Sequence, residues 1–423
     1  MSLTGIPRAT RFPRMVRVKQ QFPGPMLHDV AGAVRRALGE VPLPVRPGQS
    51  VALTAGSRGI VNIDVVVRAT VDHLKDLDAR PFIIPAMGSH GGGTAEGQRA
   101  VLEHYGVTEA AMGCPIRATM DVVQVGEVLG LPIWLDRYAA EADWIGVINR
   151  VKPHTGFSGE IGSGLLKMMT IGMGKHRGAI QAHRANIRLG YETMITALGR
   201  EMLRVGRIAF GLGIVENGYD ETALLRAFLP ADLEAGEREL LRAAKAWMAK
   251  LPFEAIDLLI VDEIGKDVSG TGMDTNVIGR HATFFEKPFT SPRITFIVAC
   301  DLTANTQGNA NGIGLADFTT RRLADRIDWH PTYVNALTAC SPRGPKLPPV
   351  LDSARDAIAV ALSSLGLERP EEARAVRIEN TLRLGEVEVS EALLPELAGR
   401  ADLARLGDPA PLAFAPDGTL PPF

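Results

Sequence analysis

Apolar runs of strand length alternate with glycine-containing turns and amphipathic stretches along the first half of the chain. Three of these runs are residues 49–55, 80–87 and 143–149. Helical patterns lie between and after them: one begins near Ile60, one ends at Tyr105, and one extends from about 179 to 204. Strands that alternate with helices are typical of βαβ units. The pattern therefore predicts an α/β fold with mainly parallel sheets.

The second half continues the pattern with further strands and helices, predicted at 207–215, 230–250, 255–265, 293–302 and 349–365. A chain of 423 residues is too long for one ordinary hydrophobic core. We therefore expect two α/β domains, residues 1–252 and 253–423, with the active site in the cleft between them. The Pro-rich segment from about residue 400 is expected to pack back onto one of the domains.

Composition and charge narrow the class of protein. The formal net charge is −2 and both signs are mixed along the chain, which argues against a nucleic-acid surface or a polybasic membrane tether. No apolar run reaches the length of a membrane span, and the basic N-terminal segment lacks the apolar stretch of a signal peptide. The cysteines, Cys114, Cys300 and Cys340, form neither a disulfide framework nor a CxxC metal motif. A cytoplasmic protein without nucleic-acid or membrane partners is expected.

Two histidines follow predicted strands, in the loops where ligands gather in parallel α/β sheets. His90 follows the run 80–87 within MGSHGGGT, and His154 follows the run 143–149 within RVKPHTGFSG. Imidazole exists in neutral and protonated forms near pH 7, so a facing pair can remove a proton on one side and return it on the other. A surface or structural role is the alternative for either histidine alone.

Two further histidines, His176 and His183, lie seven residues apart in the next helical pattern. On one helix this spacing separates two side chains by about two turns, roughly 10 Å, so they cannot bind one metal ion together. At most one of them is a metal ligand, and residue type alone does not select nickel or another metal. The absence of an HExxH motif argues against a conventional zinc hydrolase.

The segment from His154 to Lys175 is rich in glycine, which suits close approach of the backbone to an anion. It contains neither a P-loop nor a dinucleotide fingerprint. Lys167 interrupts the apolar run GSGLLKMMTIG, where desolvation would lower the pKa of the amine and make it nucleophilic. The alternative is a lysine whose stem packs while its amine reaches water, and Lys175 is a second candidate for the nucleophile.

In their order and spacing these motifs resemble the nickel-pincer-nucleotide-dependent lactate racemase family. The resemblance is carried by IIPAMGSHGGGTAEGQRAVLEHYG, PHTGFSG and GSGLLKMMTIG, and more loosely by GNANGIGLADF and IDWHPTYVNAL. It implies a nickel-pincer nucleotide, the nickel complex of pyridinium-3,5-bisthiocarboxylic acid mononucleotide. In that cofactor two sulfurs and a ring carbon bind nickel, one sulfur arm is linked to a lysine, and a histidine completes the coordination.

The resemblance also implies roles for individual residues. His90 and His154 are the acid/base pair. The family places the nickel histidine sixteen residues after the cofactor lysine, which selects Lys167 and His183, because Lys175 precedes His183 by only eight residues. The remaining residues expected beside the cofactor are Gly156, Ser158, Gly159 and Trp329.

The substrate site departs from the family pattern. Arg58 matches an arginine that holds substrate or supports the site, but the acidic residue expected three positions earlier is Ala55 here. The second-domain lysine that clamps the lactate carboxylate has no direct match, and Arg280 or Lys266 is expected in its place. The resemblance thus implies a racemase or epimerase of a 2-hydroxy acid, which passes a hydride to the cofactor and back. Cofactor maturation enzymes are its implied partners, and the particular hydroxy acid is left open.

Two other functions are compatible with the sequence. An NAD-type hydroxyacid oxidoreductase would share the alternating pattern, although no GxGxxG with an acidic residue about twenty positions later is present. A non-catalytic hydroxy-acid-binding protein of the same fold is favoured by Ala55 and by the unmatched clamp. One fold hosts many functions, so the fold by itself does not separate these alternatives.

Overall fold

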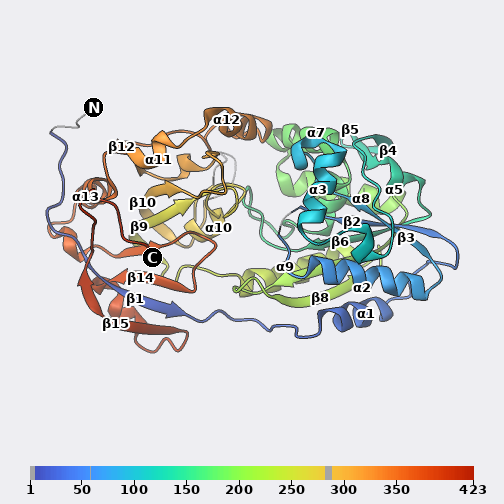
Figure 1. Ribbon diagram of the computed structural model, residues 1–423, viewed down its shortest axis with the longest axis horizontal. Coiled ribbons are helices and arrows are strands. Elements are labelled where there is room, and N and C mark those ends of the chain that lie inside the picture. Colours follow the sequence, from blue (N-terminus) through green and yellow to red (C-terminus); the bar gives the residue numbers. More distant parts are fainter. Residues whose placement is uncertain (1–4, 58, 282–287) are drawn as a thin grey trace. The chain divides into compact units, whose positions relative to one another are not determined.

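The computed structural model describes residues 5–57, 59–281 and 288–423. The predicted substrate residue Arg58 lies outside the described residues. The chain divides into two compact units: the first unit is residues 23–248, and the second unit combines residues 1–22 with 249–423. Each unit is organised around its own large sheet (Figure 1).

A five-stranded sheet of order β3-β2-β6-β7-β8 forms the centre of the first unit. Its strands are β2 (Ser50–Ala55), β3 (Arg80–Pro85), β6 (Trp144–Arg150), β7 (Ile208–Glu216) and β8 (Thr222–Phe228). Strands β3, β2, β6 and β7 run parallel, and β8 is antiparallel to β7. The aliphatic runs of β2, β3 and β7 are almost wholly buried, as expected of a parallel sheet covered on both faces.

Helices cover both faces of this sheet. They are α1 (Val30–Gly39), α2 (Ile63–Asp76), α3 (Ala95–His104), α4 (Glu109–Met112), α5 (Arg137–Glu141), α6 (Leu165–Lys167), α7 (Lys175–Leu189), α8 (Tyr191–Val205) and α9 (Leu233–Trp247), with a 3₁₀ turn at Gly91–Gly93 and a π-helix at Met168–Gly172. Apolar side chains of α1 to α4 form one core and those of α6 to α9 form another. On β2, Leu53 faces the first core and Ala52 the second, because successive strand side chains point to opposite faces.

The second unit contains an eight-stranded sheet of order β12-β11-β10-β9-β13-β14-β1-β15. Its strands are β1 (Arg14–Gln20), β9 (Ala255–Ile264), β10 (Arg293–Leu302), β11 (Phe318–Thr320), β12 (Val350–Leu351), β13 (Ala375–Ile378), β14 (Glu386–Ser390) and β15 (Leu403–Pro411). Its helices are α10 (Thr275–Ile278), α11 (Arg321–Asp325), α12 (Trp329–Thr338) and α13 (Ala354–Ser364). Strands β12 to β13 pair in parallel, whereas β14, β1 and β15 pair antiparallel. The prediction of an α/β fold with mainly parallel sheets is confirmed.

The N-terminal strand belongs to the second unit, whereas the sequence-based division grouped it with the first 252 residues. Strand β1 is hydrogen-bonded on one side to β14 and on the other to β15, so both of its backbone edges are satisfied within the second sheet. The Pro-rich C-terminal segment contributes β15 to the same sheet. No local pattern in a seven-residue strand reveals a partner that lies almost 400 residues away.

A hairpin that the sequence analysis did not predict joins β4 (Val122–Val128) to β5 (Leu131–Asp136). Its two turn residues, Leu129 and Gly130, both have positive φ, at +55° and +70°. Two-residue hairpin turns with positive φ usually contain Asn-Gly or Asp-Gly. Leucine is not typical of such turns, so the turn residues did not predict the hairpin.

The single helix predicted over residues 179–204 is wrong: the structure has two helices, α7 and α8, separated by Gly190. Gly190 has a φ of +75° and a ψ of 150°, a conformation open almost only to glycine. The chain turns at this residue, and α8 begins with the buried side chain of Tyr191. The break matters for the site, because Tyr191 then lies against residues of two other segments.

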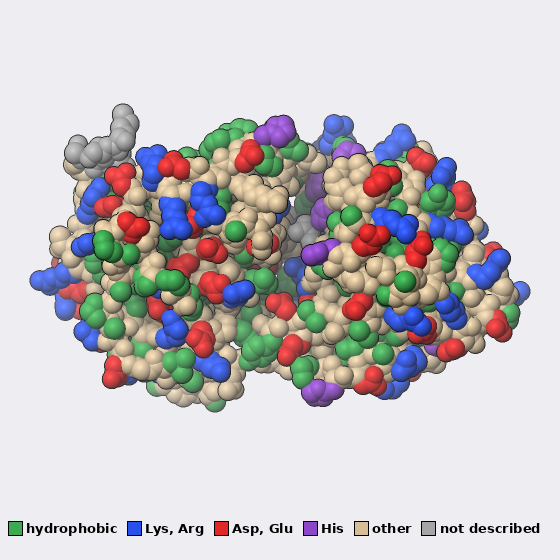
Figure 2. Space-filling view, viewed as in Figure 1, with side chains coloured by type: hydrophobic (Ala, Val, Ile, Leu, Met, Phe, Trp, Pro, Cys, Tyr) green, Lys and Arg blue, Asp and Glu red, His purple; other side chains and the backbone are tan. Residues whose placement is uncertain are grey.

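The surface carries both signs of charge. Figure 2 shows basic and acidic side chains interspersed over the visible face, in keeping with the formal net charge of −2. Among the described residues, no helix is both long enough and apolar enough to cross a bilayer.

Replacing Gly190 by alanine should destabilise the protein because the Cβ makes its backbone conformation costly. We expect Gly190→Ala to lower the free energy of unfolding by about 1–3 kcal/mol, measured by urea denaturation. Gly39→Ala is the control, because Gly39 ends α1 without positive φ and a Cβ there has open space. Equal stability of the two variants would contradict the assigned role of Gly190.

Candidate functional site

Three loops of the first unit lie at one edge of its sheet. Because β3, β2 and β6 run parallel, the segments that follow them emerge at the same edge. His90 follows β3, Ser57 follows β2, and His154 follows β6. The structure thus brings both predicted acid/base histidines to the carboxyl edge of the sheet.

The His90 loop is shaped by glycine and held by side chains. The residues after His90, Gly91 to Gly93, all have positive φ, between 64° and 67°. Ser57 Oγ contacts His90 Nδ1, and the Gln98 amide donates from Nε2 to the His90 carbonyl oxygen at 3.3 Å. A hydroxyl can donate or accept, so the Ser57 contact fixes the ring while permitting either imidazole tautomer.

The His154 ring is oriented by its own loop. The backbone amide of Gly156 donates to His154 Nδ1 at 2.8 Å, so a neutral ring carries its proton on Nε2. The ring packs against Phe157, at 4.6 Å between centroids, and against Tyr191, at 5.1 Å. The loop closes where the backbones of Lys152 and Ser163 exchange hydrogen bonds of 2.8 and 2.9 Å.

Tyr191 links His154 to His183, and the sequence analysis missed it. Its ring lies against His154, and its hydroxyl is 2.7 Å from His183 Nδ1. A hydrogen bond at Nδ1 orients an imidazole and leaves Nε2 as the nitrogen that would bind a metal. The glycine immediately before Tyr191 was the one local signal that the helix could break there.

Lys167 and His183 interact electrostatically although sixteen residues separate them. Burial, together with the positive charge of Lys167, lowers the pKa of His183 to about 4. The Lys167 amine donates to Ser163 Oγ at 3.3 Å, and the π-helix directly after α6 leads back toward α7. His183 is therefore neutral near pH 7, which is the form of imidazole that binds metals.

The described residues contain no group of three or more His, Cys, Asp or Glu side chains placed to hold a metal ion. Two nitrogen donors of this segment, the neutral imidazole of His183 and the amine of Lys167, interact electrostatically. Nitrogen ligands of this kind are compatible with nickel.

Lys175, the second lysine candidate, is buried and paired with an acidic side chain. Its side chain is wholly buried and its amine forms an ion pair with Asp136 at 3.0 Å. The amine also donates to the carbonyl oxygen of Pro85 and, at 3.2 Å, to Gln98 Oε1. The neighbouring His176 is exposed.

Close contacts within the protein explain one glycine of the loop after His154, Gly159. A Cβ on Gly159 would lie 2.5 Å from the Glu192 carboxylate. That carboxylate accepts hydrogen bonds from the amides of Glu160, at 2.7 Å, and Ile161, at 3.2 Å. These two amides are therefore occupied by an internal anion, whereas Ser158 is exposed.

The remaining predicted residues lie in the second unit. Arg280 donates to the carbonyl oxygens of Leu315, Ile294 and Thr295 and pairs with Asp317 at 2.7 Å. Lys266 lies two residues after the end of β9, and its amine donates to Gly270 O at 2.5 Å and to Asn335 Oδ1 at 2.7 Å. Trp329 begins α12, is 36% exposed, and contacts Tyr333.

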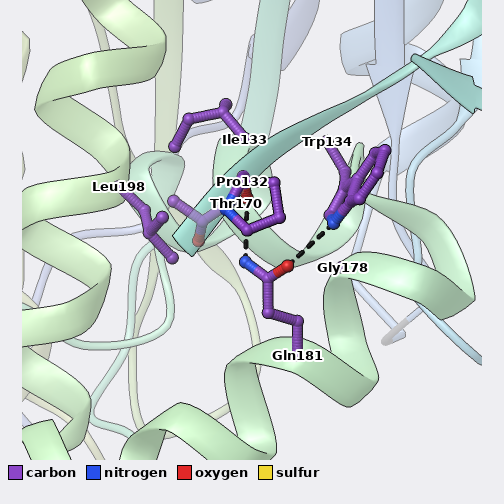
Figure 3. Close-up of a pocket in the computed structure, with 7 residues that line it drawn as sticks. All are labelled: Pro132, Ile133, Trp134, Thr170, Gly178, Gln181 and Leu198. Atoms are coloured by element: carbon purple, nitrogen blue, oxygen red, sulfur yellow. Dashed lines mark hydrogen bonds between the residues drawn. The ribbon is translucent and has the colours of Figure 1, made fainter. Parts of the chain in front are cut away.

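Residues of the segment that joins Lys167 to His183 line part of a small pocket. Figure 3 shows its lining, which includes Thr170 of the π-helix, Gly178 and Gln181 of α7, and Trp134 of β5. The Gln181 amide accepts from Trp134 Nε1 and donates to the Pro132 carbonyl, each at 2.8 Å. None of the candidate site residues lines this pocket, and the hydrogen bonds of Gln181 join α7 to β5 beside it.

Glu237 is a further residue that the sequence analysis did not single out. It is wholly buried on α9, and its Oε2 accepts from the backbone amide of Leu166 at 2.8 Å, one residue before Lys167. Burial raises the pKa of this carboxyl to about 7, and the hydrogen bonds from Leu166 and Leu165 act in the opposite direction. Glu237 falls among the apolar positions of α9, which was the available signal.

Comparison with known proteins bears on the fold. No protein-family model matches the sequence, and no curated protein matches it. Among solved structures, the chain is similar to the lactate racemase apoprotein from Thermoanaerobacterium thermosaccharolyticum, with a TM-score of 0.53. The match has 13% sequence identity and covers 89% of this chain and 94% of that chain. At this identity the likeness establishes a shared fold.

The buried Glu237 carboxyl should make stability depend on pH. Its pKa is about 7 in the folded protein and near 4.5 otherwise, so its contribution is fully present below pH 4.5 and is lost as the pH rises through 7. We expect the wild type to lose about 3 kcal/mol of unfolding free energy relative to Glu237→Gln across this window. Denaturant unfolding at several pH values measures this, with the exposed Glu239→Gln as control. A constant difference across the range would contradict the assignment.

Proposed function

We propose that this protein is a racemase or epimerase of a 2-hydroxy acid that uses a nickel-pincer nucleotide. The observation that carries the proposal is the arrangement around Tyr191, where a neutral His183 lies beside Lys167 and is linked to the proton-transfer candidate His154. The fold shared with a lactate racemase apoprotein supports the proposal independently of these residues.

Lys167 and His183 are the residues we assign to the cofactor. Lys167 would carry the covalent link through its amine, and His183 would bind nickel through Nε2 while Tyr191 orients the ring. When bound, the nickel-pincer nucleotide supplies the site that accepts the substrate hydride and returns it. The protein contributes positioning, proton transfer and exclusion of water. Gly156, Ser158, Gly159 and Trp329 remain proposed cofactor contacts.

His90 and His154 are the residues we assign to proton transfer at the substrate hydroxyl. In the tautomer whose Nδ1 donates to Ser57 Oγ, His90 presents an unprotonated Nε2 and can remove the hydroxyl proton. His154 presents an N–H at Nε2, because its Nδ1 accepts from Gly156. To return a proton from Nε2 the ring must first be protonated at Nδ1, and to take one up at Nε2 it must carry its hydrogen on Nδ1. Either state requires the His154 ring to release the Gly156 amide. Two such groups are needed because enantiomers present their hydroxyls from opposite sides.

Binding of the substrate carboxylate calls for positively charged side chains. Arg58 remains our proposal for the first of them. For the second, Lys266 is better suited than Arg280, because it lies two residues beyond the carboxyl end of the parallel strand β9, the end at which ligands bind. The Arg280 guanidinium already pairs with Asp317 and donates to three carbonyl oxygens.

Hydride transfer predicts that the Cα hydrogen stays with the substrate. Protein produced together with the cofactor maturation enzymes is incubated in D₂O with single enantiomers of a panel of 2-hydroxy acids. We expect one acid to racemise or epimerise without deuterium at Cα, measured by chiral chromatography and mass spectrometry. Deuterium at Cα, or no interconversion by nickel-loaded protein, would refute the mechanism. Accumulation of a 2-keto acid with added NAD would favour an oxidoreductase.

Histidine variants test the assigned proton-transfer residues, and His176→Ala is the control. His90→Ala and His154→Ala should each lower kcat by roughly 10²–10⁴-fold, the usual contribution of general acid–base catalysis. Nickel content should stay at the wild-type level in both. His176→Ala should retain activity, because that side chain is exposed and has no assigned role.

A further inference from the structure

The Lys175 ammonium connects four parts of the first unit from a wholly buried position. It reaches the carbonyl of Pro85 at the end of β3, Gln98 on α3, and Asp136 at the end of β5. Lys175 itself begins α7. It stands eight residues after Lys167 and eight before His183, at the middle of the segment assigned to the cofactor.

Gln98 extends this connection to the His90 loop. Its Nε2 donates to the carbonyl oxygens of Gly88, at 2.9 Å, and of His90, at 3.3 Å. A lysine ammonium only donates, so it requires the amide oxygen of Gln98 to face it. The Gln98 NH₂ group is thereby directed at the two loop carbonyls. The charge on Lys175 thus sets the orientation of the amide that holds the His90 backbone.

Stability alone is a weak reason for this ion pair. Taking both charges out of water is costly, and replacing a buried ion pair by well-packed hydrophobic residues of similar volume is often neutral or stabilising. Burial lowers the pKa of Lys175 and raises that of Asp136, each opposed by the partner's charge. Lys175 also has a φ of +53°, an uncommon conformation for a residue with a Cβ.

We propose that Lys175, Asp136 and Gln98 form a positioning unit that holds the His90 loop in register with the segment carrying Lys167 and His183. The role in turnover rests on the proposed function, whereas the structural link does not. Lys175 is then a positioning residue and takes no part in the covalent attachment of the cofactor. A shift of about 1 Å between reacting groups can cost 10²-fold in rate, so a loss of register should appear in kcat.

The test separates positioning from stability with a double variant. Lys175→Met alone leaves Asp136 charged and buried, which should lower the thermal midpoint. Lys175→Met combined with Asp136→Asn removes both charges, and asparagine keeps an acceptor for the Ala139 amide that Asp136 caps. We expect the double variant to recover most of the thermal midpoint while its kcat stays about 10- to 100-fold below wild type.

A second variant, at Gln98, tests the same connection between Lys175 and the His90 loop. Gln98→Met leaves the Lys175–Asp136 pair intact and removes the two hydrogen bonds to the His90 loop. It should lower kcat to a similar extent, with nickel content unchanged. The control is the exposed pair Arg226–Glu239 in the same unit, where Arg226→Met with Glu239→Gln should leave kcat unchanged.

Hydrogen–deuterium exchange of cofactor-free protein provides a readout that does not need activity. Amides of the His90 loop should exchange several-fold faster in the double variant and in Gln98→Met than in wild type. Full recovery of both kcat and loop protection in the double variant would overturn the proposal and leave the pair a purely structural one. If wild-type protein neither binds nickel nor turns over hydroxy acids, the proposed function fails, and the exchange data alone decide the positioning role.

Discussion

Parallel pairing of β3, β2 and β6 is the constraint on which the candidate site depends. It brings the ends of all three strands to one edge, so that Ser57 meets His90 although 33 residues separate them. A helix must return the chain after each strand, and the helices supply the two cores that bury the sheet. The edge loops are then the part of the unit left to bind and react, as in other α/β proteins.

Two lysines near this edge, Lys175 and Lys167, lie in different electrostatic surroundings. Lys175 is paired with Asp136 inside the core, where an unpaired charge would be costly. Lys167 donates to a neutral hydroxyl, and burial together with the charge of Lys167 lowers the pKa of His183. Two lysines of one short segment therefore have different physical roles, and the sequence offers little to distinguish them.

Patterns local in sequence predicted the α/β class, most strand positions of the first unit, and the place of His90 and His154 after strands. Long-range relationships were not predictable in this way. The partner strands of β1, the Lys175–Asp136 pair and the contact of Tyr191 with two histidines all join distant segments. Two misses were local: Gly190 breaks a helix within an otherwise continuous pattern, and a Leu-Gly turn closes an unpredicted hairpin. The sixteen-residue interval from Lys167 to His183 would span about 24 Å on a straight helix, and only the fold shows that the two residues interact.

The most direct test of the account is intact-mass analysis with nickel determination, on protein produced together with the cofactor maturation enzymes. Lys167→Ala and Lys175→Met are compared with wild type. We expect a nickel-bearing covalent adduct in wild type and in Lys175→Met, and none in Lys167→Ala. Absence of adduct and nickel from well-folded wild type, or loss of the adduct in Lys175→Met but not in Lys167→Ala, would contradict the account.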